Sequence, residues 1–447
     1  RNQGADAPRS PRATETAAMR ITYITAGAAG MYCGSCMRDN TLVAALARRG
    51  HDALLVPCYT PIRTDEQDVS QKRVFFGGVN VYLQQKWSLF RHTPWFLDRL
   101  LDAPSLLRWV SRFAVSTKAD DLGDLTVSML KGEHGKQKKE VAKIAQWLAS
   151  DHKPQVVNLT NAILSGMVHE LKRTVGAPIL CSLQGDDIYI EALPEPFRSQ
   201  SLQLIREHCR EIDGFIATCG YYADFMAEYF AVPRSRIHVV YPGLNLHGHG
   251  GPRPQPNGRP FTIGYFARIC PEKGLHVLAE AFRLLRSDPT APRCRLRVSG
   301  WLGESNKKYY EDIQKRLNEA GLADDFEHVE SPGHDDKVRF LHGLDVLSVP
   351  TTYREPKGLY VLEALANGVP VVQPRHGSFP ELIEATGGGV LVNPDDPADL
   401  AAGLRRLMDD PACGAELSRT GKEAVHGRFH ADRMADETAA VYAQYVR

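Results

Sequence analysis

The stretch R-E-P-K-G-L-Y-V-L-E-A-L-A-N-G-V-P, residues 354–370, decides the fold of the second half of this 447-residue chain. It follows an apolar run at residues 344–349 that predicts a buried strand, and residues 359–366 are apolar and rich in good helix formers. This order predicts a βα unit with Glu355 in the loop and Glu363 inside the helix. The unpaired N–H groups and partial positive charge at the start of such a helix favour an anionic occupant of the loop, such as a diphosphate.

The overall composition excludes several classes of protein. With 43% hydrophobic and 24% charged residues, the chain is predicted to be globular and long enough for two domains. Lys and Arg number 54 against 53 Asp and Glu, so the net charge provides no attraction for nucleic acid or an anionic membrane. Nine cysteines, an odd number in a long chain, favour a reducing compartment over a disulfide framework. Because no apolar run is long enough to span a bilayer, we expect a cytoplasmic protein.

The first half of the chain shows the pattern of a parallel α/β domain. Residues 1–18 lack the apolar segment of a signal peptide and are predicted to be a disordered tail. In residues 19–246, a strand, a glycine-bearing turn, a helix at residues 40–49 and a second strand predict a βαβ unit, and further short apolar strands, such as residues 214–217, continue it. Residues 79–149 interrupt this pattern with an aromatic-rich segment followed by a charged amphipathic helix, and we interpret them as an insertion.

A second α/β domain follows a short linker. Residues 247–260 are too rich in Gly and Pro for a helix or strand and are predicted to join the domains. Residues 261–430 contain a second series of alternating strands and helices, which begins with a predicted strand at residues 261–266. A final helix is predicted within residues 431–447, and its place after the second domain allows it to cross back onto the first.

Two cations stand at the start of the second domain. The segment G-Y-F-A-R-I-C-P-E-K-G-L places Arg268 and Lys273 between a predicted strand and the following helix. Arg offers a bidentate fork and Lys a compact charge, which together suit the neutralisation of a diphosphate without a metal. Each cation alone could be a solvated loop residue, and Glu355 and Glu363 alone could be a helix-dipole partner and a solvated residue. Their combination favours a sugar nucleotide site.

These segments resemble the donor half of the retaining glycosyltransferases of the family 4 type. The resemblance in the second domain is carried by A-R-I-C-P-E-K-G, E-P-K-G-L-Y-V-L-E-A-L-A-N-G-V-P-V-V and G-S-F-P-E-L-I. In the first domain it is looser and is carried by G-A-A-G, R-R-G-H-D-A-L-L-V and Y-P-G-L-N. The resemblance implies an α/β GT-B fold, in which two Rossmann-like doubly wound domains face each other across a cleft, the first on the acceptor side.

The resemblance also implies a role for each matching residue. Arg268 and Lys273 would hold the donor diphosphate, and Glu355 would contact the transferred sugar. Glu363 would bind the ribose hydroxyls. Three residues at the helix start would face the donor with their backbone: Gly358, Leu359 and Tyr360. In the retaining mechanism of the family, the leaving phosphate oxygen takes the acceptor proton, so no protein base is required.

The first domain should supply glycines on the donor side and polar groups for the acceptor. Gly27 and Gly30 let the loop backbone approach a phosphate or sugar, although G-x-x-G alone is a weak signal. Family members commonly carry a histidine in D-V-V-H-x-H, whereas the matching Q-V-V-N-L-T-N-A has amide and hydroxyl side chains, which cannot accept a proton near neutral pH. The following C-S-L-Q-G-D-D has Gln where another histidine is frequent, and it lacks the D-x-D pattern of a metal pair. The predicted acceptor-side residues are Asn158, Thr160, Asn161, Gln184 and Asp186.

Cys33 and Cys36 form a C-x-x-C pair after the first glycine turn. This spacing at a helix N-terminus is typical of thioredoxin-like sites. No second such pair is present in the sequence to complete a four-ligand zinc site. We therefore interpret the pair as small residues of a loop beneath the donor or acceptor, and a redox role stays open.

The predicted function is the metal-independent transfer of a hexose-type sugar, with no cofactor, from a nucleoside diphosphate sugar. The acceptor would be a carbohydrate, a lipid-linked molecule or a small molecule. The aromatic insertion fits an acceptor platform, a self-packed lid or a contact with the inner face of a membrane, and no segment suggests nucleic acid binding. Two alternatives remain open, a sugar nucleotide epimerase of the same fold and a catalytically silent sugar nucleotide binding protein.

Overall fold

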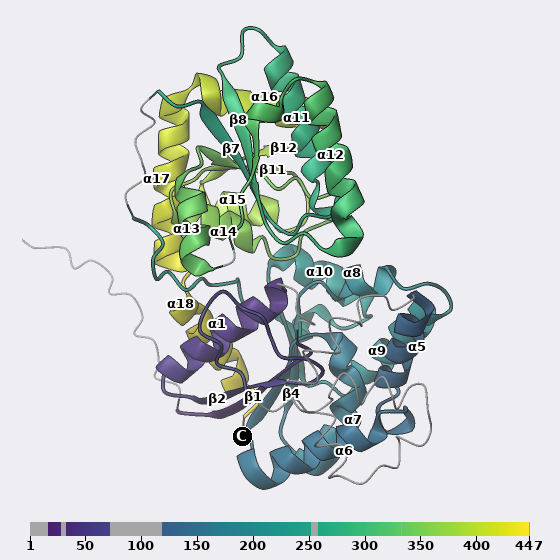
Figure 1. The fold of residues 1–447 in the computed structure, drawn as a ribbon. Helices are drawn as coiled ribbons and strands as arrows, with labels where there is room; N and C mark the ends of the chain where they lie inside the picture. Colours follow the sequence, from purple (N-terminus) through teal and green to yellow (C-terminus); the bar gives the residue numbers. More distant parts are fainter. Residues whose placement is uncertain (1–16, 28–32, 72–118, 252–257, 332, 447) are drawn as a thin grey trace, which may run out of the picture.

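The computed structural model describes residues 17–27, 33–71, 119–251, 258–331 and 333–446. The aromatic part of the predicted insertion and Gly30 lie outside these residues, as does most of the predicted tail. Within them, the chain forms two α/β domains, each built on a parallel six-stranded sheet (Figure 1). The fold class of the chain is therefore α/β with two doubly wound domains, as the sequence predicted.

The first sheet has the strand order β2-β1-β3-β4-β5-β6. Its register places Tyr23 beside Leu55 on one side and Asn158 on the other. Four of the six strands are buried along all or nearly all of their length, as expected for a parallel sheet covered by helices on both faces. The strands are β1 (Arg20–Thr25), β2 (Asp52–Pro57), β3 (Val156–Leu159), β4 (Ile179–Leu183), β5 (Gly214–Ala217) and β6 (Ile237–Val239).

The second sheet has the order β12-β11-β10-β7-β8-β9, which is the order of a Rossmann domain. Strands β8 and β9 are added on one side of β7, whereas β10 pairs with the other side of β7, so the strand order reverses there. Ligands of such sheets bind beyond the carboxyl ends of the strands at this switch point. The loops that follow β7 and β10 are therefore where a ligand is expected. The strands are β7 (Phe261–Phe266), β8 (Cys294–Ser299), β9 (Phe326–His328), β10 (Val346–Leu347), β11 (Val371–Pro374) and β12 (Gly389–Val392).

Helices cover both sheets, and several of them begin where the sequence supplies a cap. Asp396 accepts hydrogen bonds of 3.0 Å from two N–H groups at the start of α16, and Asp410 caps α17 in the same way. The helices of the first domain are α1 (Gly34–Arg48), α5 (Ala119–Leu130), α6 (Lys138–Trp147), α7 (Val168–Val175), α8 (Asp186–Glu191), α9 (Phe197–His208) and α10 (Gly220–Tyr229). Those of the second are α11 (Leu275–Ser287), α12 (Lys307–Glu319), α13 (His334–His342), α14 (Leu359–Ala366), α15 (Phe379–Thr386), α16 (Pro397–Asp409) and α17 (Pro411–Arg428).

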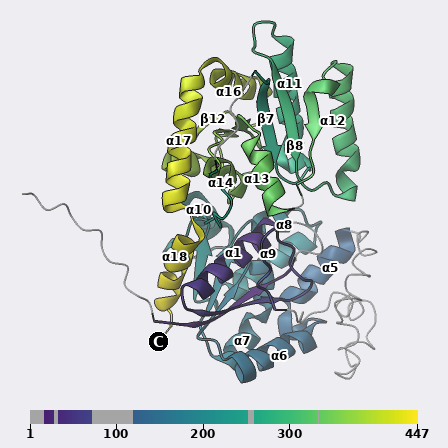
Figure 2. The ribbon, with the colours of Figure 1, turned by 60° about the vertical axis from the view of Figure 1, so that its left-hand side comes forward.

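The last helix, α18 (Ala431–Ala443), returns to the first domain and packs on α1 (Figure 2). Its Tyr442 is buried in the same apolar cluster as Ile21 of β1. On the surface, Arg48 lies 3.0 Å from Asp432, and Arg49 lies 2.6 Å from Asp436. The chain thus crosses between the domains twice, and this double crossing restrains their relative position.

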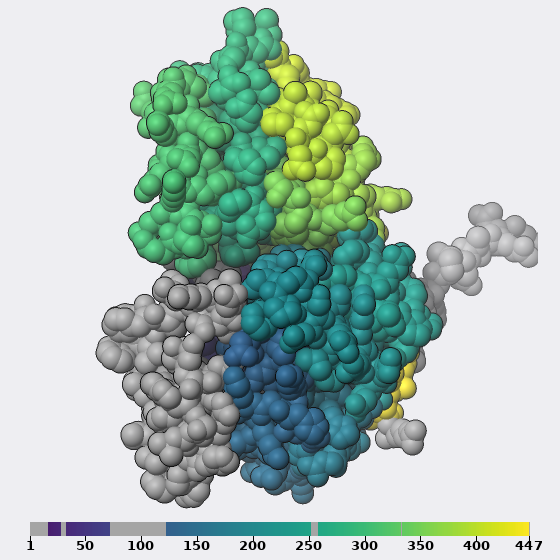
Figure 3. All heavy atoms as spheres, turned by 90° about the vertical axis from the view of Figure 1, so that its right-hand side faces the viewer, coloured from purple at the N-terminus to yellow at the C-terminus, as the bar shows by residue number. Residues whose placement is uncertain are grey.

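The carboxyl ends of the two sheets face each other. Thr218, just after β5, donates to the carbonyl of Pro356 at 2.7 Å. Glu381 of α15 accepts from the backbone N–H of Gly220 at 2.9 Å and from the hydroxyl of Tyr241 at 2.8 Å. Figure 3 shows the second domain, green to yellow, resting on the teal part of the first. Loops at the switch point of the second sheet are therefore brought against the first domain.

Candidate functional site

Lys273 and Glu355 form a buried ion pair at the switch point of the second sheet. Lys273 lies in the short turn after β7 and Glu355 in the loop after β10. The Lys273 Nζ is 2.6 Å from the Glu355 Oε2, and the two side chains are 11% and 4% exposed. The hydroxyl of Tyr353 donates to the same Glu355 oxygen at 2.6 Å and also contacts the ammonium group. The sequence placed these two charges in one site, and the structure brings them into contact.

Charge holds the Glu355 carboxyl in its ionised form. Burial alone would raise its pKa, but the ammonium groups of Lys273 and Lys357 outweigh burial and lower the pKa to about 2. At neutral pH, Glu355 is therefore a hydrogen-bond acceptor and not an acid. Such a group can orient a hydroxyl, and it cannot donate a proton to a leaving group.

Glu355 also occupies the start of α14. Its Oε1 accepts from the N–H of Lys357 at 3.2 Å and from the N–H of Gly358 at 3.3 Å. Gly358 has a positive φ of +63°, a backbone conformation that favours glycine, and a Cβ there would also displace the end of the Leu382 side chain. The helix start that the sequence predicted for a diphosphate is thus partly satisfied by a protein carboxylate.

The next two residues of α14 support this site. The hydroxyl of Tyr360 donates to Glu355 at 3.3 Å, and the Lys273 ammonium lies 5.2 Å from the centre of the Tyr360 ring. Leu359 is half-buried and packs against the apolar core of the second domain. The side chains of both residues are therefore used within the protein.

Arg268 does not join the buried pair. Its guanidinium is 41% exposed and lies 3.8 Å from Glu272, which is itself 42% exposed. Its backbone carbonyl accepts a hydrogen bond of 2.8 Å from Tyr265, which fixes the loop but leaves the side chain at the surface. Arg268 and Lys273 thus share a loop, and they differ sharply in burial.

Glu363 is held by a lysine that bridges the two domains. The Nζ of Lys337, on α13, lies 2.8 Å from Glu363 and 2.5 Å from Asp65 of the first domain. All three side chains are at most 9% exposed. Burial would lower the pKa of Lys337, but the two carboxylates outweigh it and raise the pKa well above the ordinary value for lysine. The carboxylate predicted to bind a ribose thus takes part in a contact between domains.

Three predicted acceptor-side residues lie in a buried hydrogen-bond network centred on Asp39 of α1. Gln184 and Tyr23 each donate to Asp39 at 2.9 Å, and Thr160 donates to its other oxygen. Asn158 donates at 3.0 Å to Ser182, which in turn contacts Tyr23. Asn158, Thr160 and Gln184 are at most 3% exposed. We call Tyr23, Asp39, Asn158, Thr160, Ser182 and Gln184 the Asp39 network.

Asp186 and Asn161 hold the neighbouring loops. Asp186 accepts from the N–H of Ala162 at 2.6 Å and from the N–H of Gln184 at 2.9 Å, so it joins the loops after β3 and β4. Burial raises the Asp186 pKa to about 6, although these backbone donors oppose the rise. Asn161 precedes the turn after β3, and among the described residues its Oδ1 has no hydrogen-bond partner. Of the five predicted acceptor residues, Asn161 is the one only partly buried.

Gly27 serves a close approach within the first domain. It has a φ of +92°, and a Cβ there would overlap with the backbone carbonyl of Thr60. The neighbouring N–H of Tyr59 donates to the Ala26 carbonyl at 3.0 Å. Glycine is therefore needed at position 27 because its backbone packs directly against the loop after β2.

Sequence reasoning missed Lys357 and Asp39. The ammonium of Lys357 donates to Ser35 at 3.0 Å and to the carbonyl of Gln184, so a residue of the second domain reaches the helix start of α1. Its position in E-P-K-G, beside Glu355, was the available signal. Asp39 was harder to find, because a charged residue inside a helix is ordinarily assigned to solvent.

No metal site or membrane helix is found in the described part of the chain. No group of three or more His, Cys, Asp or Glu side chains there is arranged to hold a metal ion. None of the described helices has the length and apolar character needed to cross a bilayer.

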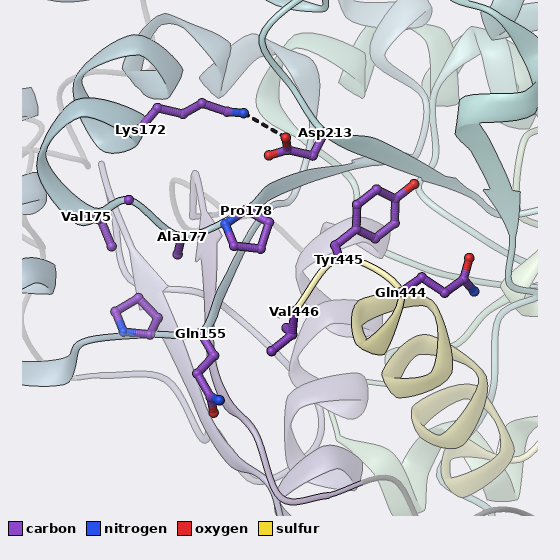
Figure 4. Close-up of a pocket in the computed structure, with 11 residues that line it drawn as sticks. Gln155, Lys172, Val175, Ala177, Pro178, Asp213, Gln444, Tyr445 and Val446 are labelled. Carbon is purple, nitrogen blue, oxygen red and sulfur yellow. Dashed lines mark hydrogen bonds and ion pairs between the residues drawn. The ribbon is translucent and has the colours of Figure 1, made fainter.

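A cavity of about 620 Å³ lies in the first domain, beside Gln155, Asp213 and Tyr445 (Figure 4). These residues stand at the amino ends of β3 and β5 and at the chain end, so this cavity is remote from Glu355.

Two family models match the chain. Residues 40–243 match the glycosyl transferase 4-like domain, and residues 252–424 match the glycosyl transferases group 1. A glycogen synthase of Mycobacterium tuberculosis is 30% identical over 52% of this chain and 54% of its own length. A D-inositol 3-phosphate glycosyltransferase of Streptomyces avermitilis is 32% identical over 52% of this chain and 51% of its own length. The chain thus spans about half the length of these curated relatives.

Solved structures agree on the fold. HepE of Anabaena, in complex with UDP, aligns with a TM-score of 0.66 over 95% of this chain and 100% of its own, at 16% identity. The sucrose-phosphate synthase of Thermosynechococcus elongatus gives a TM-score of 0.69 over 95% and 98%, also at 16% identity. The family models cover both domains, and the two Rossmann-like sheets face each other as the fold requires. The chain therefore belongs to the group 1 glycosyltransferases of GT-B fold.

Proposed function

We propose that this protein is a retaining glycosyltransferase that moves a hexose-type sugar from a nucleoside diphosphate sugar to an acceptor, without a metal or cofactor. The observation that carries the proposal is the buried Lys273–Glu355 pair at the switch point of the second sheet. The relatives named above are glycosyltransferases or a glycogen synthase, and structures of HepE hold UDP and UDP-glucose. These matches support a nucleotide sugar as the donor.

The proposed roles follow from charge and burial. Lys273 would bind the diphosphate while keeping Glu355 ionised, since an ammonium group has three donors and can serve both partners. Arg268, exposed in the same loop, would add a bidentate contact to the phosphates. Glu355, as an acceptor, would orient hydroxyls of the transferred sugar. These three are the residues to which we assign catalysis.

The remaining donor contacts are assigned to α14 and to the glycine loop. Glu363 would accept hydrogen bonds from the ribose hydroxyls through the oxygen that does not hold Lys337. The backbone from Gly358 to Tyr360 would face the donor, because the N–H groups at a helix start attract anionic groups. Gly27 would let its loop approach the donor, and the same role is proposed for Gly30.

The proposed reaction needs no basic side chain. The bond between the anomeric carbon and the diphosphate oxygen breaks, and the acceptor oxygen bonds to that carbon from the same face. The acceptor proton passes to the departing phosphate oxygen. In the positions where a family histidine is frequent, Asn158 and Gln184 are buried and hydrogen-bonded, which supports a mechanism driven by electrostatic stabilisation of the leaving group.

A carbohydrate, a lipid-linked molecule or a small molecule would be the acceptor. Asn161 is the predicted acceptor-side residue that best fits a contact with it, because it is the one of the five that is only partly buried. The nine cysteines are free, which supports a reducing, cytoplasmic compartment. A peripheral contact with the inner face of a membrane would bring the enzyme to a lipid-linked acceptor. The affinity of the protein for anionic lipid vesicles tests this contact.

The test is a donor panel followed by a product assay. UDP-, GDP- and ADP-sugars are first compared for thermal stabilisation, where a donor at a hundredfold excess over its Kd adds about 2.7 kcal/mol. The stabilising donor is then incubated with candidate acceptors, and the anomeric configuration of the product is read by NMR. Retention supports the proposal. A changed nucleotide sugar without acceptor would identify an epimerase, and donor binding without turnover a silent binding protein.

The matched variants are Lys273→Met and Lys172→Met. Both lysines are ion-paired, but Lys172 pairs with Asp213 at the amino end of β5, on the side of the first sheet away from the second domain. Loss of a cation that stabilises the leaving group costs about 2 to 4 kcal/mol of barrier, or roughly 30- to 1,000-fold in kcat. We expect this loss for Lys273→Met alone. Equal rates in both folded variants would overturn the diphosphate assignment.

A further inference from the structure

Cys33 and Cys36 are in contact at the start of α1. Cys33 is the N-cap residue, and its carbonyl accepts the first helical hydrogen bond, from Met37 at 3.0 Å. Cys36 lies one turn later and is 3% exposed, whereas Cys33 is only partly buried. Cys33 and Cys36 thus lie at the two ends of the first helical turn, and their side chains interact with each other. A disulfide needs Cα atoms about 4.4 to 6.8 Å apart, which the i, i+3 spacing of one helical turn allows.

The surroundings favour a thiolate at Cys33. The hydrogen bond from Cys36 is the main cause, and the backbone N–H of Cys36 and the ammonium of Lys357 act in the same direction. Although burial opposes them, they lower the Cys33 pKa to about 5. The interaction with the Cys33 side chain, followed by burial, raises the pKa of Cys36. One accessible thiolate beside one buried thiol is the arrangement of a reactive dithiol.

Lys357 ties this pair to the second domain. Its ammonium donates to Ser35, which lies between the two cysteines, at 3.0 Å. The lysine belongs to the loop that carries Glu355, so the charge that favours the Cys33 thiolate comes from across the domain interface. The other seven cysteines, all within described residues, are free as well.

We propose that Cys33 and Cys36 form a redox-active dithiol at the domain interface, which a small-molecule disulfide such as oxidised glutathione converts to an intramolecular disulfide. The inference is independent of the sugar-transfer proposal. It concerns a site to which the proposed reaction assigns no role.

The exchange balances in two steps. The Cys33 thiolate attacks one sulfur of the disulfide, forming a mixed disulfide and releasing one thiolate. Cys36 then gives its proton to solvent and attacks the Cys33 sulfur, which expels the second thiolate. Two electrons pass from the protein dithiol to the oxidant, and each released thiolate takes up a proton according to its pKa. The products are one protein disulfide and two molecules of reduced thiol.

The first test is a redox titration of the wild-type protein. Purified protein is equilibrated in glutathione buffers between about −280 and −150 mV, quenched with acid and digested. The tryptic peptide of residues 21–38 contains both cysteines and no others, so its disulfide appears as a loss of two hydrogens. We expect a midpoint within this window. A peptide that stays in the dithiol form throughout, or carries only glutathione adducts, would overturn the proposal.

The second test measures reactivity within the same chain. Cys413, also only partly buried, is the internal control. At pH 6.5, we expect iodoacetamide to modify Cys33 roughly tenfold faster, because its larger thiolate fraction outweighs its lower intrinsic nucleophilicity. Cys36→Ser should convert the disulfide product to a stable glutathione adduct on Cys33. Equal alkylation rates of Cys33 and Cys413 would show that Cys33 is not a thiolate at this pH and would overturn the proposed reactive dithiol.

The third test addresses the domain interface. Lys357→Met should move the pH midpoint of Cys33 alkylation upward by roughly half a unit, and Lys357→Arg should restore it. Lys172→Met is the control, since this lysine lies on α7 and pairs with Asp213. An unchanged midpoint in Lys357→Met would refute the role of the second domain in activating the thiol.

Discussion

Buried polar side chains have different partners in the loops of the second domain and in the interior of the first domain. In the second, Lys273 and Glu355 are charged, paired and placed at the carboxyl ends of strands, where a ligand can exchange with one of the partners. In the first, the Asp39 network satisfies its own donors beneath the interface. Buried polar residues therefore form the proposed ligand site in one domain and a self-satisfied network in the other. Their partners and their place in the fold, more than residue type, separate the two cases.

The largest expected effect is the collapse of the Asp39 network. Asp39→Ala removes the carboxylate that accepts from Tyr23, Thr160 and Gln184, and it leaves the buried guanidinium of Arg38 without its anionic partner. We expect the free energy of unfolding to fall by about 3 to 6 kcal/mol, measured by urea denaturation. Asp312→Ala, on the exposed face of α12, is the control and should change it little. A loss below about 1 kcal/mol would show that the network is not structural.

A slightly smaller effect is expected at the bridge between domains. Lys337→Met leaves the carboxylates of Asp65 and Glu363 buried without a cation. Loss of one partner of a buried ion pair should lower the free energy of unfolding by about 3 to 4 kcal/mol. Lys307→Met, at an exposed pair with Glu304, is the control and should leave the free energy of unfolding nearly unchanged. Similar losses in the two variants would remove the distinction between buried and surface pairs.

The pH dependence of stability tests the charge on Glu355. Its folded pKa of about 2 lies below the ordinary 4.5, so its stabilisation is fully present above pH 4.5 and is lost as pH falls through about 2. The shift corresponds to about 3 kcal/mol at most. The measurement is the difference in unfolding free energy between wild type and Glu355→Gln from pH 2 to 7. A difference that does not vary over this range would mean that Glu355 has the same pKa in the folded and unfolded protein, so that Lys273 and Lys357 do not stabilise its carboxylate.

The smallest effect on stability is expected at Arg268. Its pairing with Glu272 is exposed, and such pairs contribute less than about 1 kcal/mol. We expect Arg268→Gln to change the free energy of unfolding by less than about 0.5 kcal/mol and to reduce kcat strongly. Glu272→Gln should leave both quantities unchanged. Retention of full activity in Arg268→Gln would remove this residue from the proposed diphosphate site.

Strands were the elements that local sequence predicted best. The apolar runs at residues 214–217 and 261–266 coincide with β5 and β7, because a buried parallel strand needs only a short apolar segment between polar loops. The first helix was predicted from residue 40, but α1 begins at Gly34. Its first turns bury Arg38 and Asp39, so the amphipathic pattern that signals a helix is absent there.

The sequence by itself determined the α/β class, the two domains and the loops that carry Arg268, Lys273 and Glu355. These follow from local apolar patterns and from the rule that ligands lie at the carboxyl ends of parallel strands. Only the tertiary structure decided that Glu363 is bridged to Asp65, that Lys357 reaches α1, and that Asn158, Thr160 and Gln184 are buried. Each of these contacts joins residues far apart in the chain. Local patterns carry no information on such pairs, because their burial depends on how the elements pack together.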